Sequence, residues 1–296
     1  MKEKEIDFGR AKVSSLFNRV FFPTLLGMLG MSAMTAIDGI FIGHSVGSDG
    51  IAAVNIVVPV LMLLTGVGLM VGMGCSVVSS LRLARGQVLA ARVSVTRAMA
   101  AVPLVAVVVV GAMLAFPDAS ARALGSSEHL LPLVREYMVW YIPSWLFMLW
   151  TAVALFVIRL DGAPNLAMAC SLTSAVLNVF LDWLFMFPFG WGIMGAAFAT
   201  SLSTAAGGVI AVAYLLFFAR RLRVVRVRVG WRALRAAARD LAGQCRVGSS
   251  SLLAEATLAV LTFMGNYVFM SYLGDDGVGA FGIACYYTPF VFMVGN

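Results

Sequence analysis

Two aspartates, Asp38 and Asp182, lie inside long apolar stretches of this 296-residue chain. Apart from Glu255, the other acidic residues fall in or beside polar segments. A charged side chain in the middle of a bilayer costs about 2.5 to 3.5 kcal/mol on insertion scales, so an acid at that depth usually faces a cavity or a proton relay. Carboxylates in such a setting exchange protons or bind cations. The two aspartates therefore indicate the chemistry of transport.

The sequence around the second aspartate supplies another oxygen ligand. Asn178 precedes Asp182 by four residues, so on a helix both side chains lie on one face. Each aspartate lies five or six residues before the C-terminal end of its stretch, which the orientation predicted below places outside. Both carboxylates then lie about 7 to 9 Å below that outer edge. Two carboxylates in a low-dielectric region do not both stay ionised at low cost, so we expect them to share a proton or a cation. A structural tie between helices is the alternative.

Glu255 differs from the aspartates because it lies about two turns from the N-terminal end of its apolar stretch, which the orientation predicted below places on the inner side. We expect it to belong to a second ion or proton site or to an inner gate, with a structural helix contact as the alternative. Weaker candidates, which would line an outward-facing cavity, are Asn55, Tyr137, Tyr141 and Asn266. Tyrosine is common near membrane interfaces for other reasons.

The segments that carry these residues are long enough to cross a membrane. Hydrophobic residues make up 61% of the chain and charged residues 12%, which leaves too little polar surface for a soluble globule. A spanning helix needs about 20 apolar residues, whereas barrel strands show about 10 residues of alternating polarity. We therefore predict an all-α integral membrane protein with eight spans. The spans are 20–42, 51–81, 98–116, 131–158, 166–187, 193–219, 247–273 and 278–294.

Small residues recur within two of these spans. Because they let helices pack closely or bend, we expect them to serve the scaffold rather than a binding site. They are Gly66, Gly68, Gly72 and Gly74 in the second span and Gly195, Ala196 and Ala197 in the sixth.

The basic residues predict the orientation. Every Lys and Arg except Arg122 and Arg135 lies in the N-terminal segment or in the connections after the second, fourth and sixth spans. The positive-inside rule then puts the N-terminus and the linker 220–246 in the cytoplasm of a multi-pass plasma-membrane protein. Anionic lipid headgroups explain the arginines of the linker, whose second half is expected to lie on the membrane as an amphipathic helix. Nucleic acid is not an expected partner, because Trp231 is the linker's only aromatic residue.

Cysteine and histidine give no sign of a metal or catalytic site. The four cysteines show no paired spacing, and His44 and His129 fall in or beside outer loops, far from acidic clusters in the sequence. A membrane enzyme would need a His/Asp cluster or a nucleophile with its base, and neither pattern occurs. We expect no metal site, no cofactor other than a coupling ion, and no enzymatic activity.

An internal repeat predicts the architecture. The stretch from Thr35 aligns without gaps on the stretch from Thr262, and six spans separate the copies, so both run in the same direction. This pattern is typical of two bundles related by an axis along the membrane normal. We expect a six-helix bundle at 1–219, a basic cytoplasmic linker at 220–246 and the start of a second bundle at 247–296, with about four further spans missing. The identical pairs are Thr35/Thr262, Gly47/Gly274, Asp49/Asp276, Gly50/Gly277, Ala53/Ala280 and Ile56/Ile283.

A series of short motifs extends along the chain in order. They are Asp38 with GIFIGHSVG after it, the connection RLDGAPNLAM, Asn178 and Asp182 in NVFLD, GIMGAAFAT at 192–200, and Glu255 in SSSLLAEAT. Their order and their positions in the spans make the chain similar, over its whole length, to the multidrug and toxic compound extrusion (MATE) transporters.

The resemblance implies a secondary active efflux antiporter that exchanges protons or sodium ions for amphipathic, often cationic, drug-like compounds by alternating access. It implies an ion or proton site in the first bundle made of Asp38, Asn178, Asp182 and Thr200. Many members carry an asparagine late in the fourth span, where this chain has Leu155. A lipid-linked oligosaccharide flippase of the same wider superfamily is the alternative, but it would be expected to carry mid-span Lys or Arg for pyrophosphate. We expect a monomer whose partners are drug-like substrates and membrane lipids.

Overall fold

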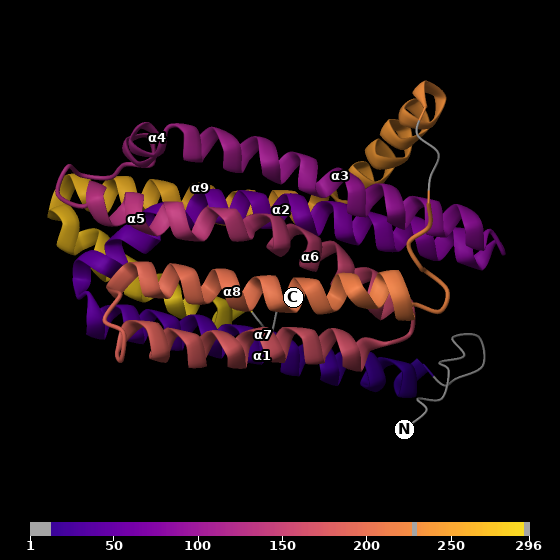
Figure 1. The fold of residues 1–296 in the computed structure, drawn as a ribbon, viewed down its shortest axis with the longest axis horizontal. Coiled ribbons are helices and arrows are strands. Elements are labelled where there is room, and N and C mark those ends of the chain that lie inside the picture. Colours follow the sequence, from indigo (N-terminus) through magenta and orange to yellow (C-terminus); the bar gives the residue numbers. More distant parts are fainter. Residues whose placement is uncertain (1–12, 227–229, 293–296) are drawn as a thin grey trace.

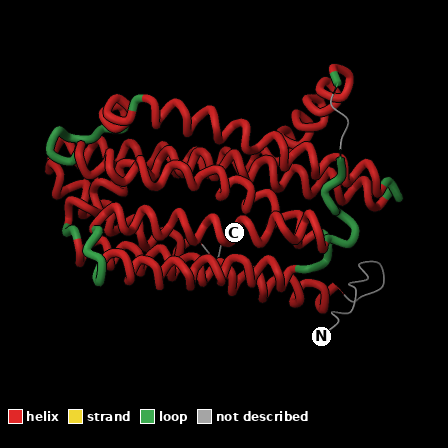
Figure 2. Tube along the Cα trace, viewed as in Figure 1, coloured by secondary structure: helices red, strands yellow, loops and turns green. Residues whose placement is uncertain are grey.

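A computed structural model describes residues 13–226 and 230–292, and every regular element in those ranges is helical (Figures 1 and 2). The predicted all-α fold is confirmed. A 3-10 turn, Ile142–Ser144, joins α5 to α6, and a π-helical turn, Tyr214–Phe218, follows α8. The α-helices are α1 (Val13–Ser45), α2 (Ser48–Ala84), α3 (Val88–Ala115), α4 (Pro117–Ala123), α5 (Leu131–Tyr141), α6 (Trp145–Leu160), α7 (Pro164–Met186), α8 (Gly192–Ala213) and α9 (Trp231–Phe292).

In the described part of the chain, seven helical stretches are long and apolar enough to cross a membrane. Eight spans were predicted, and the difference lies in α9, which contains both of the last two. The helix begins at Trp231, inside the predicted linker, and continues unbroken into the predicted seventh span. The Arg-rich second half of the linker is therefore continuous with this candidate membrane-spanning helix. Residues 293–294 of the predicted eighth span lie outside the described residues.

The two copies of the repeat share a backbone conformation at their turns. Gly47, between α1 and α2, has φ 88° and ψ −162°, and Gly274, inside α9, has φ 66° and ψ −152°. This region of φ and ψ is essentially restricted to glycine, because a Cβ would clash with the backbone. The kink at Gly274 divides α9 into two arms, which supports the repeat that the sequence predicts.

The most extensive contact between two helices joins α2 to α9. A Cβ on Gly74 would overlap the carbonyl group of Gln244, and a Cβ on Gly248 would overlap that of Met70. Glycine at these two positions lets the backbones of α2 and α9 touch, so the predicted scaffolding role of Gly74 is confirmed. The contact brings the start of the second repeat against the first bundle.

Elsewhere in the first bundle, α1 packs on α7 and α7 packs on α8. The helices α5 and α6, which both contact α8, form one bent span, 131–160. The bend falls at the 3-10 turn, where Pro143 has no N–H to donate to a continuous helix. These helices carry the predicted polar residues.

Candidate functional site

The predicted ion site is assembled around α7. Asn178 and Asp182 lie one turn apart and are both fully buried, and Thr200 on α8 is 8% exposed. Asn178 Nδ2 donates a hydrogen bond to Thr200 Oγ1 at 3.2 Å, which turns the amide oxygen of Asn178 away from Thr200. Three of the four residues that the family resemblance implied are therefore neighbours.

Asp38 joins this group from α1. That helix packs along α7, and the carboxylate of Asp38 interacts electrostatically with the carboxylate of Asp182. Asp38 is partly buried and Asp182 is fully buried. We call Asp38, Asn178, Asp182 and Thr200 the outer acid site.

The outer acid site contains more hydrogen-bond acceptors than hydrogen-bond donors. Within the described residues, four buried oxygens have no hydrogen-bond partner: Asp38 Oδ1, Asn178 Oδ1 and both carboxylate oxygens of Asp182. A buried polar atom without a partner costs about 1 to 3 kcal/mol, and a charged one costs more. A proton or a small cation would satisfy several of these oxygens at once, because both are attracted to carboxylate and amide oxygens.

Three tyrosines surround Asp38. Tyr137 and Tyr141 on α5 are buried, with ring centroids 5.1 Å apart, and both interact electrostatically with Asp38. Tyr286, from the second arm of α9, interacts with Asp38 as well, and its ring lies 2.9 Å from where a Cβ on Gly39 would be. The hydroxyl of Tyr286 has no partner among the described residues. Tyr286 was not among the residues predicted from the sequence, although it shares with Tyr137 and Tyr141 the signal of a polar aromatic residue in an apolar stretch.

Asn55 and Asn266, predicted to line the cavity, contact each other in this structure. Asn55 Nδ2 donates to Asn266 Oδ1 at 2.6 Å, and Asn266 Nδ2 donates to the carbonyl oxygen of Asn55 at 2.9 Å. Both are nearly inaccessible, at 3% and 4% exposure. They form a reciprocal amide pair between α2 of the first repeat and α9 of the second.

Glu255 is not brought to the outer acid site. Its side chain packs on Gly66 of α2, and it forms no hydrogen bond or ion pair within the described residues. Glu255 lies eleven residues before Asn266 on α9, so it is about 16 Å further toward the end of the molecule that carries Arg220. The structure thus places Glu255 at the contact between the repeats, in the half nearer Arg220.

Asp161, in the connection between α6 and α7, is a buried acid that was not predicted from the sequence as a site residue. Its carboxylate accepts hydrogen bonds from the hydroxyl of Tyr214 at 2.9 Å and from three backbone N–H groups at 2.8 to 2.9 Å. Those N–H groups belong to Arg220, Arg221 and Leu222. Asp161 therefore fixes the start of the linker to the first bundle.

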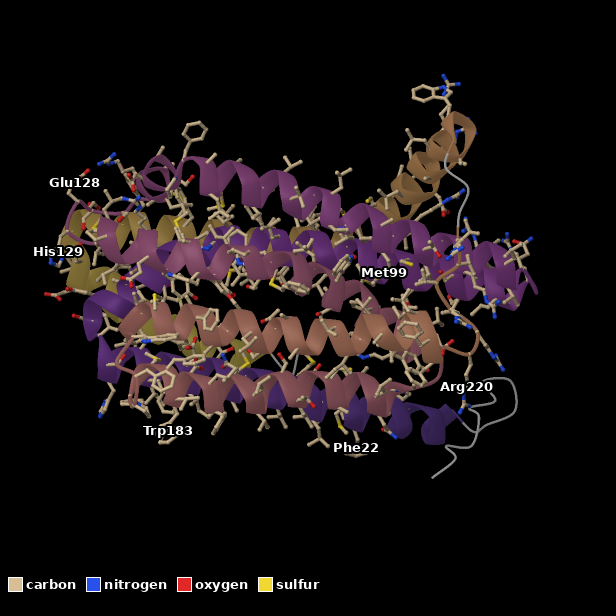
Figure 3. The ribbon with its side chains drawn as sticks, in the orientation of Figure 1. Phe22, Met99, Glu128, His129, Trp183 and Arg220 are labelled. Atoms are coloured by element: carbon tan, nitrogen blue, oxygen red, sulfur yellow. The ribbon has the colours of Figure 1, made fainter. Side chains whose placement is uncertain are left out.

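At the opposite end of the molecule, a histidine lies between the turns of the two repeats (Figure 3). His129 Nδ1 is 3.1 Å from a carboxylate oxygen of Asp275, and His129 Nε2 is 3.9 Å from one of Asp49. Beside it, Arg122 donates to Glu128 at 2.9 Å and holds the pKa of that carboxyl below its usual value. Within the described residues, no group of three His, Cys, Asp or Glu side chains forms a metal site.

Known proteins resemble this chain in sequence and in structure. The sequence model of the MatE family matches residues 23–184. The multidrug export protein MepA of Staphylococcus aureus strain MRSA252 is 25% identical over 287 residues, which cover 96% of this chain and 62% of that protein. MepA of Staphylococcus saprophyticus is 25% identical over 290 residues, with the same shares of each chain. The chain thus spans about three-fifths of the length of these relatives.

Solved structures share the fold. The MATE multidrug transporter DinF-BH has a TM-score of 0.83 and 23% identity, and the match covers 99% of this chain and 65% of that one. An inward-facing MATE family transporter of the MOP superfamily has a TM-score of 0.76 and 25% identity, covering 88% of this chain and 60% of that one.

Proposed function

This chain belongs to the MatE family, and on that basis we propose that it is the first bundle and the start of the second bundle of a multidrug efflux antiporter. The antiporter exchanges a proton or a sodium ion for amphipathic, often cationic, organic compounds. Support for the substrate class comes from the multidrug export proteins that resemble the chain over 96% of its length.

The observation that carries the proposal is the excess of acceptors in the outer acid site. Four buried oxygens on Asp38, Asn178 and Asp182 have no protein donor among the described residues. An ion that binds one conformation of a transporter more tightly shifts the protein toward that conformation, and only this difference in affinity couples the ion to transport. In the proposed cycle, the ion enters from outside and stabilises the state from which substrate has left.

Each residue has a distinct part in this cycle. Asp182 and Asp38 hold the ion, and Thr200 orients the amide of Asn178 so that its oxygen is available. Tyr137 and Tyr141 border Asp38 and offer aromatic faces, which attract organic cations through their π electrons. A cationic substrate near Asp38 and an ion on the same carboxylates would compete, which is the exchange that antiport requires.

Efflux from cells tests the proposal. The protein, expressed from its full open reading frame, should lower the accumulation of several unrelated cationic dyes, with pH and sodium gradients varied independently. We expect export to collapse when one of the two gradients is removed. Export that ignores both gradients would contradict coupled antiport, and translocation of a lipid-linked oligosaccharide without dye export would favour a flippase.

A further inference from the structure

A cavity of about 420 Å³ opens at the inner end of the molecule, far from the outer acid site. Three guanidinium groups line it, each from a different helix: Arg82 on α2, Arg97 on α3 and Arg239 on α9. Its volume lies within the range of roughly 300 to 1,000 Å³ that is usual for small-ligand sites. We call these three residues, with Asp240, the inner arginine pocket.

One carboxylate organises the inner arginine pocket without neutralising it. Asp240, whose side chain is 6% exposed, contacts Arg82 at 2.5 Å and Arg97 at 3.4 Å, and accepts a hydrogen bond from Ser94 at 3.0 Å. Arg239 forms no ion pair or hydrogen bond among the described residues, and the buried Nε of Arg97 has no partner there either. Three positive groups against one negative group leave two positive charges in the walls, which favour an anion.

The fixed geometry of the pocket makes an anion with several oxygens the best match. Arg82 reaches both carboxylate oxygens of Asp240, so its guanidinium plane is held before any ligand arrives. Guanidinium groups bind phosphate through paired N–H donors, and a group that is already oriented loses less entropy on binding. The chemistry therefore selects a phosphate group.

The surroundings indicate that this phosphate belongs to a lipid. Leu81 is 55% exposed beside Arg82, and on the first turns of α9 Trp231 and Leu234 are 69% and 61% exposed. These turns project from the bundle beside α3, at the end that carries Arg220 (Figures 1 and 3). Exposed tryptophan is typical of the level of lipid headgroups, and exposed leucine suits acyl chains. A free phosphate would gain nothing from these apolar neighbours.

We propose that the inner arginine pocket binds the phosphate of an anionic phospholipid, which holds the first arm of α9 against α2 and α3. The lipid thereby fixes the start of the second repeat to the first bundle. Nothing in this proposal depends on the coupling ion or on the exported compound.

Native mass spectrometry tests the proposal on the purified chain, with phosphatidylglycerol compared against phosphatidylcholine. Arg239→Gln removes the unpaired guanidinium and leaves the contacts of Asp240 in place. Arg246→Gln is the matched control, because Arg246 is exposed on the same helix and outside the pocket. The loss of one charge-assisted hydrogen bond predicts about a tenfold or larger decrease in apparent affinity for phosphatidylglycerol in Arg239→Gln, with Arg246→Gln close to wild type.

Inorganic phosphate distinguishes a lipid from a soluble anion. We expect phosphatidylglycerol to raise the melting temperature of the detergent-solubilised protein at concentrations where inorganic phosphate has no effect. Equal protection by inorganic phosphate would overturn the assignment to a lipid. Equal retention of the two lipids, or equal loss of phosphatidylglycerol from both arginine variants, would overturn the site itself.

Discussion

The hydrogen bond from Asn178 to Thr200 decides which atoms the outer acid site presents. Because the amide nitrogen is occupied by Thr200, the amide oxygen is left as an acceptor beside Asp182. A site built in this way offers oxygens only, and it suits a proton or a small cation better than an anion. In the proposed ion site, selectivity for positive charge would therefore depend on a residue that is itself neutral.

Replacement of Thr200 by valine should show this dependence. Thr200→Val keeps the shape but removes the acceptor, so the buried Asn178 amide loses its partner at a cost of about 1 to 3 kcal/mol. We expect a lower melting temperature and a higher ion concentration for half-maximal export. Thr257→Val is the control, because Thr257 is exposed and bonds only within its own helix. If the two variants were indistinguishable, Thr200 would have no orienting role.

The sequence singled out the residues of the outer acid site but not all of the residues that the structure places near them. Asp38 and Asp182 stand out because an acid in an apolar stretch is rare, and their spans follow from length and apolarity. Asp161 and Tyr286 were missed because an acid beside a loop and a tyrosine in a span are both common. Only the structure shows that one accepts three backbone N–H groups and that the other borders Asp38.

At the level of helices, the sequence predicted least about the contact between α2 and α9. The Arg-rich segment before residue 247 indicates a surface linker by composition, yet the helix from Trp231 continues through it. Glycine spacing in α2 predicted close packing but not the partner helix, because the partner is far away in the sequence. Gly74 and Gly248 show how closely the two backbones approach.

Adding one methyl group at this contact should separate the two helices. Gly248→Ala puts a Cβ into the carbonyl of Met70, and overpacking of this kind costs about 1 to 3 kcal/mol. Gly111→Ala on α3 is the control, because nothing lies within 4 Å of its Cβ position and alanine favours a helix by about 0.5 to 1 kcal/mol. Thermal unfolding in detergent should show a lower melting temperature for Gly248→Ala only. Equal melting temperatures would mean that the close approach of α2 and α9 does not stabilise the fold.

At the level of the whole molecule, the two ends differ in charge and in the contacts that join the repeats. The end that carries Arg220 also carries the inner arginine pocket, whereas the opposite end carries His129 between Asp49 and Asp275 (Figure 3). The amide pair of Asn55 and Asn266 lies in the contact between the repeats. In the proposed antiport cycle, one bundle rocks against the other, so we expect these contacts to be rearranged.

The orientation can be tested by labelling single cysteines in a variant without the four native ones. Ser45→Cys, at the exposed end of α1, should react with a membrane-impermeant maleimide added outside intact cells. Arg226→Cys, in the exposed part of the linker, should react only after the cells are opened, because the positive-inside rule places the linker in the cytoplasm. Labelling of both positions from the same side would contradict the proposed topology.

The most direct test of the central claim, that Asp38 and Asp182 bind the coupling ion, is infrared difference spectroscopy on the purified chain in lipid bilayers. Spectra are recorded between low and high pH, with and without sodium, and the carbonyl stretch of protonated carboxyl groups is followed. We expect a carboxyl signal that responds to pH or sodium, that is lost in Asp38→Asn and in Asp182→Asn, and that persists in the control Asp118→Asn, on the short helix α4. An unchanged signal in both aspartate variants, with the same response to pH and sodium as in the wild type, would contradict this claim.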